Sequence, residues 1–341
     1  MVANQKMRLL RRRRAVGYNT HKTLKVNKMK TDRIRGGILG AVIGDAIGVP
    51  VEFRSREHLK RFPVTNMREF GTHHQPKGTW SDDSSLMLCL IESIIEDFDI
   101  NKLGQKFVNW KNEGYWTPHG KVFDIGITTR TAIDKIKKGY LPQEAGGNFE
   151  DDNGNGSLMR ILPLIFIMDQ IQNEDKKFQI ISDVSSITHG HIRSILACKF
   201  YIDYALKIWK GGDKFEAYQL TINEFIEFVD KKNFPEREKR VLTKLLDGNL
   251  IQRKENEIGS SGYVVSTLIA SMWSFLKSNS YQEAVLKAVN LGEDTDTTGI
   301  VTGGLAGLHY GVNNIPEDWI KQIVKVEEIE KLIEKLKNKV L

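Results

Sequence analysis

Cysteine is scarce in this sequence, which contains only Cys89 and Cys198. Both lie in apolar runs, "SLMLCLIESII" and "SILACKFYIDYAL", whose spacing is that of a buried helix face. Two cysteines placed in this way provide neither a disulfide framework nor a thiolate metal site. We therefore interpret both as core residues of a reduced, cytoplasmic protein, and we expect neither zinc nor redox chemistry.

Long apolar runs are missing too. No run approaches the roughly 20 residues that a membrane helix needs, and no signal peptide is visible. The alternating pattern of β-strands, long Pro/Gly/Ser linkers and internal repeats are nearly absent. With 40% hydrophobic and 27% charged residues, the composition is that of a globular protein. We expect a monomer that does not contact membranes.

Acidic residues are absent from residues 1–30, which hold ten of the 50 Lys and Arg. The rest of the chain then has 40 basic against 43 acidic residues, so the net charge of +7 belongs to this arm alone. The arm has little apolar periodicity, and we expect it to be disordered when free. Three interpretations stay open: contact with nucleic acid or another anionic partner, a solvated tail, or an extension upstream of a natural start at Met29.

Helical periodicity covers almost all of the chain after the arm. It predicts helices over 32–48, 81–98, 100–113, 124–138, 155–170, 190–210, 213–230, 237–248, 261–277, 280–290 and 327–341. We therefore predict a single compact all-α domain over residues 31–341, with residues 211–257 as a helical insertion.

Glycine is concentrated where a helix can least tolerate it. In "NLGEDTDTTGIVTGGLAGLHYG" (290–311), Gly299, Gly303 and Gly307 recur every four residues and share one helix face. Each glycine costs about 1 kcal/mol relative to alanine in a helix interior. Another part of the chain is therefore expected to approach this face very closely.

Two acidic clusters stand at the starts of predicted helices, Ser81-Asp82-Asp83 and Asp294 to Thr297. Either cluster alone is explained by helix capping. If the two clusters face each other, however, their carboxylates repel unless cations lie between them. Oxygen ligands without Cys or His favour hard ions such as Mg²⁺ or Mn²⁺, and the spacing is not that of an EF-hand.

Six segments carry a family resemblance. They are "RGGILGAVIGDAIGVPVEF", "WSDDSSL", "FDIGITTR", "NGNGSLMR", "THGH" and "GEDTDTTG", and they span residues 33 to about 311. In this order they resemble the ADP-ribosylglycohydrolase family, relatives of the enzyme that removes ADP-ribose from nitrogenase reductase. The resemblance implies one orthogonal multi-helix domain with a binuclear Mg²⁺ or Mn²⁺ centre in a cleft.

The resemblance assigns roles to the acidic residues. It implies these metal ligands: Ser81, Asp82, Asp83, Asp294, Asp296 and Thr297. It implies that Glu52 gates the cleft and assists water activation, and that Asp124 lies near the scissile bond. The residues alone leave a second interpretation of Asp124 open, as the N-cap of a helix that begins at residue 125.

The resemblance also implies contacts to the substrate. Gly126 would let a diphosphate approach the backbone, while Asn155, Gly156 and Ser157 would wrap phosphate and ribose. His189 would hydrogen-bond the diphosphate. Arg160 is interpreted as a support of the loop from behind.

Two positions depart from the family pattern. Ser81 stands where the family usually has Thr, and it keeps the hydroxyl. Glu293 stands where the family usually has Gly, and it adds a charge beside the metal ligands. We interpret Asp45 as structural, and Trp80 and Phe123 as core residues.

The resemblance implies a metal-dependent hydrolase that removes ADP-ribose from a modified protein side chain, arginine above all, by attack of a metal-activated water at ribose C1″. One alternative is an immunity protein that neutralises an ADP-ribosylating toxin, partly by occlusion of the toxin through the arm. A third hypothesis is a nucleic-acid module that binds through the arm alone. The acceptor linkage cannot be read from the sequence.

Overall fold

The computed structural model describes residues 28–341. The predicted disorder of the arm thus falls on residues 1–27, which lie outside the described part. Residues 28–30, which we assigned to the arm, already belong to the first helix, which runs over 28–48 and ends in the 3₁₀ turn η1 (Val49–Val51).

The all-α prediction is confirmed. The other helices are α2 (Arg56–Arg61), α3 (Asp82–Ile95), α4 (Ile100–Glu113), α5 (Ile127–Lys137), α6 (Pro142–Ala145), η2 (Glu150–Asp152), η3 (Leu162–Leu164), α7 (Ile165–Met168), α8 (Glu174–Ser186), α9 (Ile192–Trp209), α10 (Lys214–Lys231), α11 (Glu236–Val241), α12 (Thr243–Leu246), η4 (Leu250–Gln252), η5 (Glu255–Glu257), α13 (Val264–Leu276), α14 (Tyr281–Val289), α15 (Thr295–Tyr310), η6 (Val312–Asn314), α16 (Glu317–Gln322) and α17 (Val326–Val340). Over the described range, β structure is limited to two isolated bridges, Gly147–His189 and Gly154–Tyr263.

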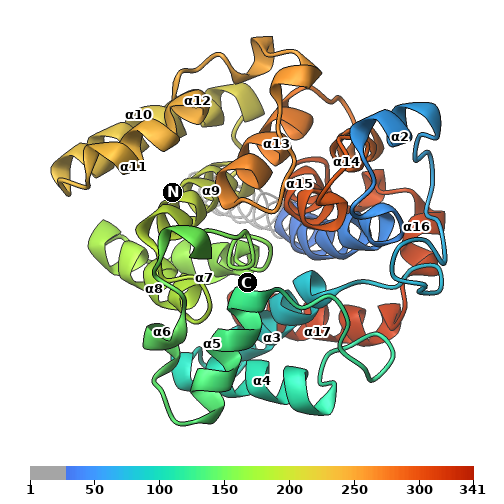
Figure 1. Cartoon of the computed structure of the whole chain (residues 1–341), viewed down its shortest axis with the longest axis horizontal. Coiled ribbons are helices and arrows are strands. Elements are labelled where there is room, and N and C mark those ends of the chain that lie inside the picture. The colour runs from blue at the N-terminus through green and yellow to red at the C-terminus, as the bar shows by residue number, and fades with distance from the viewer. Residues whose placement is uncertain (1–27) are drawn as a thin grey trace, which may run out of the picture.

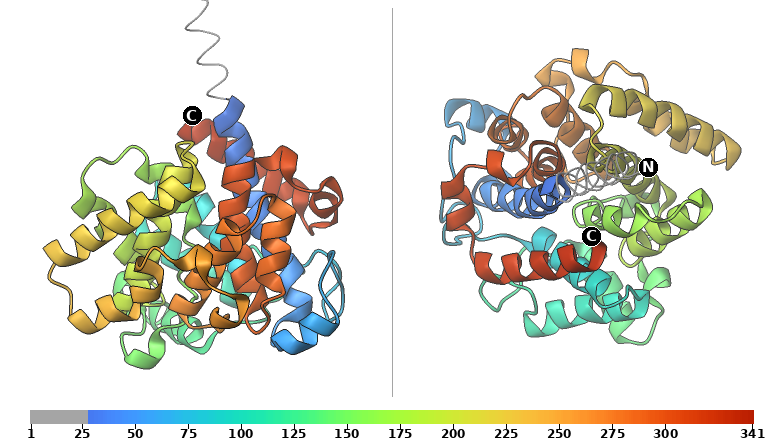
Figure 2. Two further views of the ribbon diagram at one scale, coloured as in Figure 1. Left: turned by 90° about the horizontal axis from the view of Figure 1, so that it is seen from above. Right: turned by 180° about the vertical axis from the view of Figure 1, so that it is seen from behind.

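The helices pack around the first helix, α9 and α15 (Figure 1). Helices α13 and α14 cover α15, while α3, α4 and α17 pack together on another side. Figure 2 shows the first helix, in blue, running beside the orange α15. Residues 211–257 form α10 to η5 along one edge, where α10 packs on α9. That this segment is an insertion stays a prediction.

The glycine stripe of α15 packs against the first helix. A Cβ atom built on Gly299 would overlap the carbonyl oxygen of Gly44, and one on Gly303 would overlap that of Gly40. Because the same overlaps arise when Cβ atoms are built on the first helix, both helices need glycine here. The predicted close approach is confirmed, and it brings the start of α15 against Gly48.

The helix prediction missed the short helices α2, α6 and α16, and it was wrong in three further places. Residues 155–161 are turns rather than helix, and only η3 and α7 follow them, because Pro163 and the polar glycine loop interrupt the helical hydrogen bonds. The predicted helix 237–248 is split into α11 and α12. Helix α8 was missed because few of its residues are buried, among them Ile181 and Val184.

One helix is longer and more apolar than we expected from the sequence. Lys28–Val51 is long and apolar enough, by length and composition, to cross a membrane. However, 94% of its most apolar 18-residue window is buried inside the fold, as in the core helix of a globular protein. Both cysteines are also buried, in agreement with their predicted place in the core.

Candidate functional site

The first acidic cluster is held by a carboxylate from the first helix. Asp45 accepts hydrogen bonds from the backbone N–H of Ser81 (3.0 Å) and of Ser84 (3.1 Å), which lie at the N-terminus of α3. Ser81 is the N-cap, and its hydroxyl accepts from the Asp83 N–H at 3.2 Å. The structural role predicted for Asp45 is therefore confirmed. Burial raises the pKa of Asp45 to about 7 against these hydrogen bonds.

The second acidic cluster forms the N-terminus of α15. Asp294 is the N-cap residue, but its side chain makes no capping bond. Its Oδ2 instead accepts a hydrogen bond from Asn155 Nδ2 at 2.9 Å. One carboxylate oxygen of Asp296 accepts from the Thr297 N–H at 2.9 Å. Thus the carboxylate of Asp294 is bound to Asn155 rather than to a backbone N–H of its own helix.

The structure brings the two clusters together. A cleft of about 290 Å³ is lined by Asp82 and Asp83 from α3 and by Asp294 and Thr297 from the start of α15. More than two hundred positions separate the clusters in the sequence, and the close packing of the first helix on α15 places them side by side. Ser81 and Asp296 lie behind the cleft wall, where each is almost fully buried.

Three oxygen atoms of these carboxylates are buried without a hydrogen-bond partner among residues 28–341: Asp83 Oδ2, Asp294 Oδ1 and Asp296 Oδ2. Buried polar atoms are nearly always paired, so each of these atoms requires an explanation. Burial, together with the charges of neighbouring acids, raises the pKa of Asp83 and of Asp296 well above its usual value. Bound cations would satisfy these oxygens and offset the repulsion. The residues therefore fit hard divalent ions.

Glu52 and Asp124 extend the acidic surface of the cleft. Oxygen atoms of Glu52, Asp294 and Asp296 lie within 4.8 Å of one another. Burial and the charges of Asp124 and Asp294 raise the pKa of Glu52 to about 10. Glu52 follows directly on η1, which the Pro50 turn and the packing of Gly48 hold against α15.

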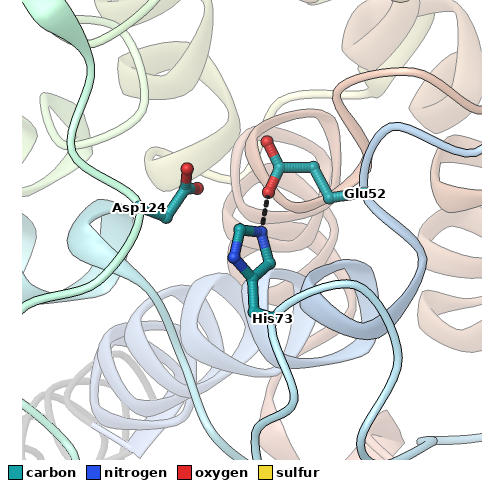
Figure 3. A group of neighbouring side chains, drawn as sticks. All are labelled: Glu52, His73 and Asp124. Atoms are coloured by element: carbon teal, nitrogen blue, oxygen red, sulfur yellow. Dashed lines mark hydrogen bonds and ion pairs between the residues drawn. The ribbon is translucent and has the colours of Figure 1, made fainter.

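The structure decides between the two interpretations of Asp124. Helix α5 begins at Ile127 and its N-cap is Gly126, so the N-cap interpretation of Asp124 is wrong. Asp124 has a φ of 52°, a left-handed conformation that is uncommon for residues other than glycine. Its carboxylate lies near Glu52 in the cleft (Figure 3). Strained backbone of this kind is often found at functional sites.

Sequence reasoning missed His73. Its Nε2 is hydrogen-bonded to Glu52 Oε2 (Figure 3), and its ring contacts those of Phe53 and Phe123. Phe123, expected in the core, is half-buried against His73, whereas Trp80 is fully buried as predicted. His73 belongs to none of the six motifs. The signal that was available is a pair of histidines in "GTHHQPKGTW", directly before the first acidic cluster.

Most of the residues predicted to contact the substrate line the same cleft. Gly126, Asn155, Gly156 and His189 all face the cleft. A Cβ atom on Gly156 would come within 2.6 Å of His189 Cε1, so this position must be glycine for the ring to stay in place. Burial, followed by the charge of Arg160, lowers the pKa of His189 to about 3, and the imidazole is therefore neutral at pH 7.

Ser157 and Arg160 lie behind the wall of this cleft. The Ser157 hydroxyl accepts from Ser185 at 3.0 Å and contacts Cys198 Sγ in the core, so its side chain does not reach the cleft as we had expected. Residues 156–160 form a turn in which Ser157 is fully buried. Arg160 is fully buried and donates to the Gly156 carbonyl, which confirms it as a support of the loop.

Glu293 is exposed, with a φ of 62°. The left-handed conformation explains why glycine suits this position. Its N–H donates to the Arg54 carbonyl at 2.8 Å, and its own carbonyl accepts from the Phe53 N–H at 2.7 Å. The backbone of Glu293 thus joins the start of α15 to the segment that follows Glu52.

Known proteins resemble the whole of the described chain. Residues 27–340 match the family model described as ADP-ribosylglycohydrolase. The chain is 33% identical over 327 residues to "ADP-ribosylarginine hydrolase Tri1" of Serratia proteamaculans, which covers 93% of this chain and 82% of that protein. It is 26% identical over 322 residues to "ADP-ribosyl-[dinitrogen reductase] glycohydrolase" of Rhodospirillum rubrum, which covers 89% of this chain and 95% of that protein.

The fold has a close counterpart among solved structures. An "ADP-ribosylglycohydrolase-related protein complex" superposes with a TM-score of 0.76 at 29% identity, and the match covers 92% of this chain and 100% of that one. The single all-helical domain, the six motifs in order and the match over residues 27–340 agree with one another. The chain therefore belongs to the ADP-ribosylglycohydrolase family of hydrolases.

Proposed function

We propose that this ADP-ribosyl hydrolase cleaves the bond between ribose C1″ of ADP-ribose and the guanidino group of a modified arginine side chain. The observation that carries the arginine specificity is the pairing of Glu52 and Asp124, which lie side by side in a cleft whose lining contains no Lys or Arg from residues 28–341. Two neighbouring carboxylates favour a cationic group beside them. A guanidinium meets this requirement, whereas a serine or carboxyl acceptor does not.

The names of two relatives support this proposal. The Serratia protein is named an ADP-ribosylarginine hydrolase, and so is a protein of Pseudomonas putida that is 31% identical over 312 residues.

The cleft also offers a place for the diphosphate without basic side chains. Helix α5 has no side-chain cap, so the backbone N–H groups of its first turn are free to donate. Gly126, Ile127 and Thr128 of this turn line the cleft. A helix N-terminus is well suited to bind a phosphate group, and Gly126 leaves room for it to approach the backbone.

Two divalent cations, Mg²⁺ or Mn²⁺, would be held by Asp83, Asp294 and Asp296 with their neighbours, and would supply positive charge that orients the ribose hydroxyls and acidifies water. The charge of these cations would offset the acids that raise the pKa of Glu52 in their absence, so that Glu52 is ionised and accepts the proton of the attacking water as the C1″–O bond forms. The C1″–N bond breaks, and the departing guanidine takes up the proton that Glu52 received from the water. Asp124 stabilises the cationic guanidinium before and after the step.

A linkage panel tests the proposal. ADP-ribose linked to arginine, serine, aspartate or glutamate, and DNA would each be incubated with the protein in Mg²⁺, in Mn²⁺ and in EDTA. We expect release from the arginine substrate with either ion, loss of release in EDTA, and strong loss in Asp294→Ala. Release from another linkage but not from arginine would reject the arginine assignment, and release unaffected by EDTA would reject the cations.

A second role, neutralisation of an ADP-ribosylating toxin by occlusion, is motivated by the ten basic and no acidic residues of the arm. If the arm occludes a toxin, protection should survive Asp294→Ala but disappear on removal of residues 1–28. The reverse pattern would reject occlusion and leave hydrolysis as the source of protection.

A further inference from the structure

The loop 70–75 is anchored to the turn that carries Glu52. The Thr72 N–H donates to the Pro50 carbonyl at 3.0 Å, and the Thr72 hydroxyl donates to the Glu52 carbonyl at 2.7 Å. Gly71 packs so closely that a Cβ atom there would overlap the Pro50 carbonyl oxygen. The loop and the turn are therefore one unit, and their side chains are fixed relative to each other.

The loop is also closed on itself. The Phe70 N–H donates to the Gln75 carbonyl at 2.7 Å, and the His74 N–H donates to the Gly71 carbonyl at 3.2 Å. Gln75 Nε2 donates to the His73 carbonyl at 3.1 Å. Three bonds in so short a segment leave little freedom to the backbone of His73.

The His73 imidazole is directed at Glu52 (Figure 3). Its Nε2 is hydrogen-bonded to Glu52 Oε2, and its ring centroid lies 5.9 Å from that of Phe53 and 5.4 Å from that of Phe123. The His73 side chain is 15% exposed and that of Glu52 is 6% exposed. The contact is therefore sheltered from water, which strengthens a polar interaction.

Glu52 has few other partners. Among the described residues, the side chains that face its carboxylate are acidic apart from His73: Asp124, Asp294 and Asp296. Repulsion from these acids would turn an untethered Glu52 carboxylate away from the cleft. A hydrogen bond to Glu52 Oε2 would oppose that rotation, and His73 makes it from a place where its ring nitrogen lies within 4.8 Å of oxygen atoms of both Glu52 and Asp124 (Figure 3).

We propose that His73 is a positioning residue for Glu52: it holds Oε2 and so leaves Oε1 fixed for the water that attacks C1″. This inference rests on the proposed role of Glu52 in hydrolysis. It assigns to His73 no contact with substrate and no place among the cation ligands.

The kinetic test compares three variants with the wild-type protein. His73→Phe keeps an aromatic ring but removes the donor, and we expect kcat to fall roughly 10- to 100-fold, as for other residues that orient a catalytic group. KM should stay within about twofold, because the substrate does not touch His73. His73→Gln should restore part of kcat. The matched control is His74→Ala, since His74 is exposed in the same loop, and it should behave as wild type.

Coupling to Glu52 separates positioning from a general structural role. In a Glu52→Gln background, His73→Phe should cause little further loss of kcat, because the two residues act as one unit. Mn²⁺ affinity measured by calorimetry should be unchanged in His73→Phe. Additive losses, no difference between His73→Gln and His73→Phe, or a large loss of Mn²⁺ affinity would each overturn the proposal.

A readout without substrate keeps the two proposals distinguishable. In ¹⁵N-histidine NMR spectra of the full chain, the His73 ring-nitrogen signals, assigned by their absence in His73→Phe, should shift in Glu52→Gln and stay in place in His74→Ala. If the wild type released ADP-ribose from none of the linkages, the proposed function would fail. The NMR signal would still report whether His73 is hydrogen-bonded to Glu52. If the His73 signals did not shift in Glu52→Gln, the proposed positioning of Glu52 by His73 would be wrong, whether or not the protein is active.

Discussion

Asn155 donates from Nδ2 to Asp294 Oδ2 at 2.9 Å, and the same amide nitrogen donates to Thr267 Oγ1 at 2.8 Å. A residue expected to wrap phosphate and ribose thus holds a predicted metal ligand by its side chain. The amide fixes one oxygen of Asp294, and the other, Oδ1, remains without a partner.

Asn155→Ala should therefore weaken the binding of Mn²⁺, by about 10- to 100-fold, since residues that orient metal ligands commonly have effects of this size. Calorimetric titration with Mn²⁺ measures the affinity directly. Thr267→Val removes only the second partner of the amide, and a smaller effect is expected. An unchanged affinity in Asn155→Ala would contradict the positioning of Asp294 by this amide.

Asp296→Asn should separate stability from cation binding. The variant loses a buried charge that faces other acids, so its melting temperature in EDTA should equal or exceed that of the wild type. The wild type should gain about 2.7 kcal/mol of stability at a cation concentration of 100 Kd, and the variant should gain much less. Differential scanning fluorimetry with and without Mn²⁺ measures both effects. Equal gains in the two proteins would remove Asp296 from the ligand set.

The acidic clusters predict a pH dependence of stability in EDTA. Burial raises the pKa of Glu52 to about 10 and that of Asp82, Asp83 and Asp296 well above its usual value, so the folded protein retains protons that the unfolded chain has lost. This stability is complete below the unfolded pKa of about 4 and declines as the pH rises toward the folded values. The free energy of unfolding in urea should fall between about pH 5 and pH 9, by about 1.4 kcal/mol per pH unit for each retained proton. Mn²⁺ should flatten the decline; a stability that rises over this range in EDTA would contradict the prediction.

The contact between the glycines of α15 and those of the first helix predicts that neighbouring positions of α15 differ in the stability lost on substitution. Gly303→Ala should destabilise the protein by about 1–3 kcal/mol, because its Cβ would meet the backbone of Gly40, which cannot move aside cheaply. Gly304→Ala meets the end of the Leu162 side chain instead and should cost less. Urea unfolding of the two variants measures the difference. If the two variants lost the same free energy of unfolding, contact with the backbone of Gly40 would not be the reason that position 303 needs glycine.

Replacement of Glu293 by glycine is predicted to increase the stability of the protein. Glu293→Gly should stabilise the protein by up to about 1 kcal/mol, because it relieves a left-handed conformation at the cost of some unfolded-state entropy. Glu293→Ala removes the same charge but keeps the conformation, so it serves as the matched control and should give no gain. A gain of equal size in both variants would assign the effect to the charge of Glu293.

The sequence by itself determined the helical class and the family, because apolar periodicity and short motifs are local properties. The spacing of Gly299, Gly303 and Gly307 even required a partner at close range, since no other reason offsets the cost of three glycines in one helix. It could not name the partner, which the structure shows to be the first helix. The paired acids at the starts of α3 and α15 likewise predicted bound cations only if the two clusters lie close together. The sequence could not show that they do.

Tertiary structure alone decided which side chains reach the cleft. Ser157 stands inside a matching motif, yet its hydroxyl is hydrogen-bonded to Ser185 in the core. His73 stands outside every motif, yet its loop is pinned to Pro50 and brings its ring to Glu52. The direction of a side chain depends on backbone dihedrals and on contacts between distant segments, and neither leaves a periodic trace in the sequence.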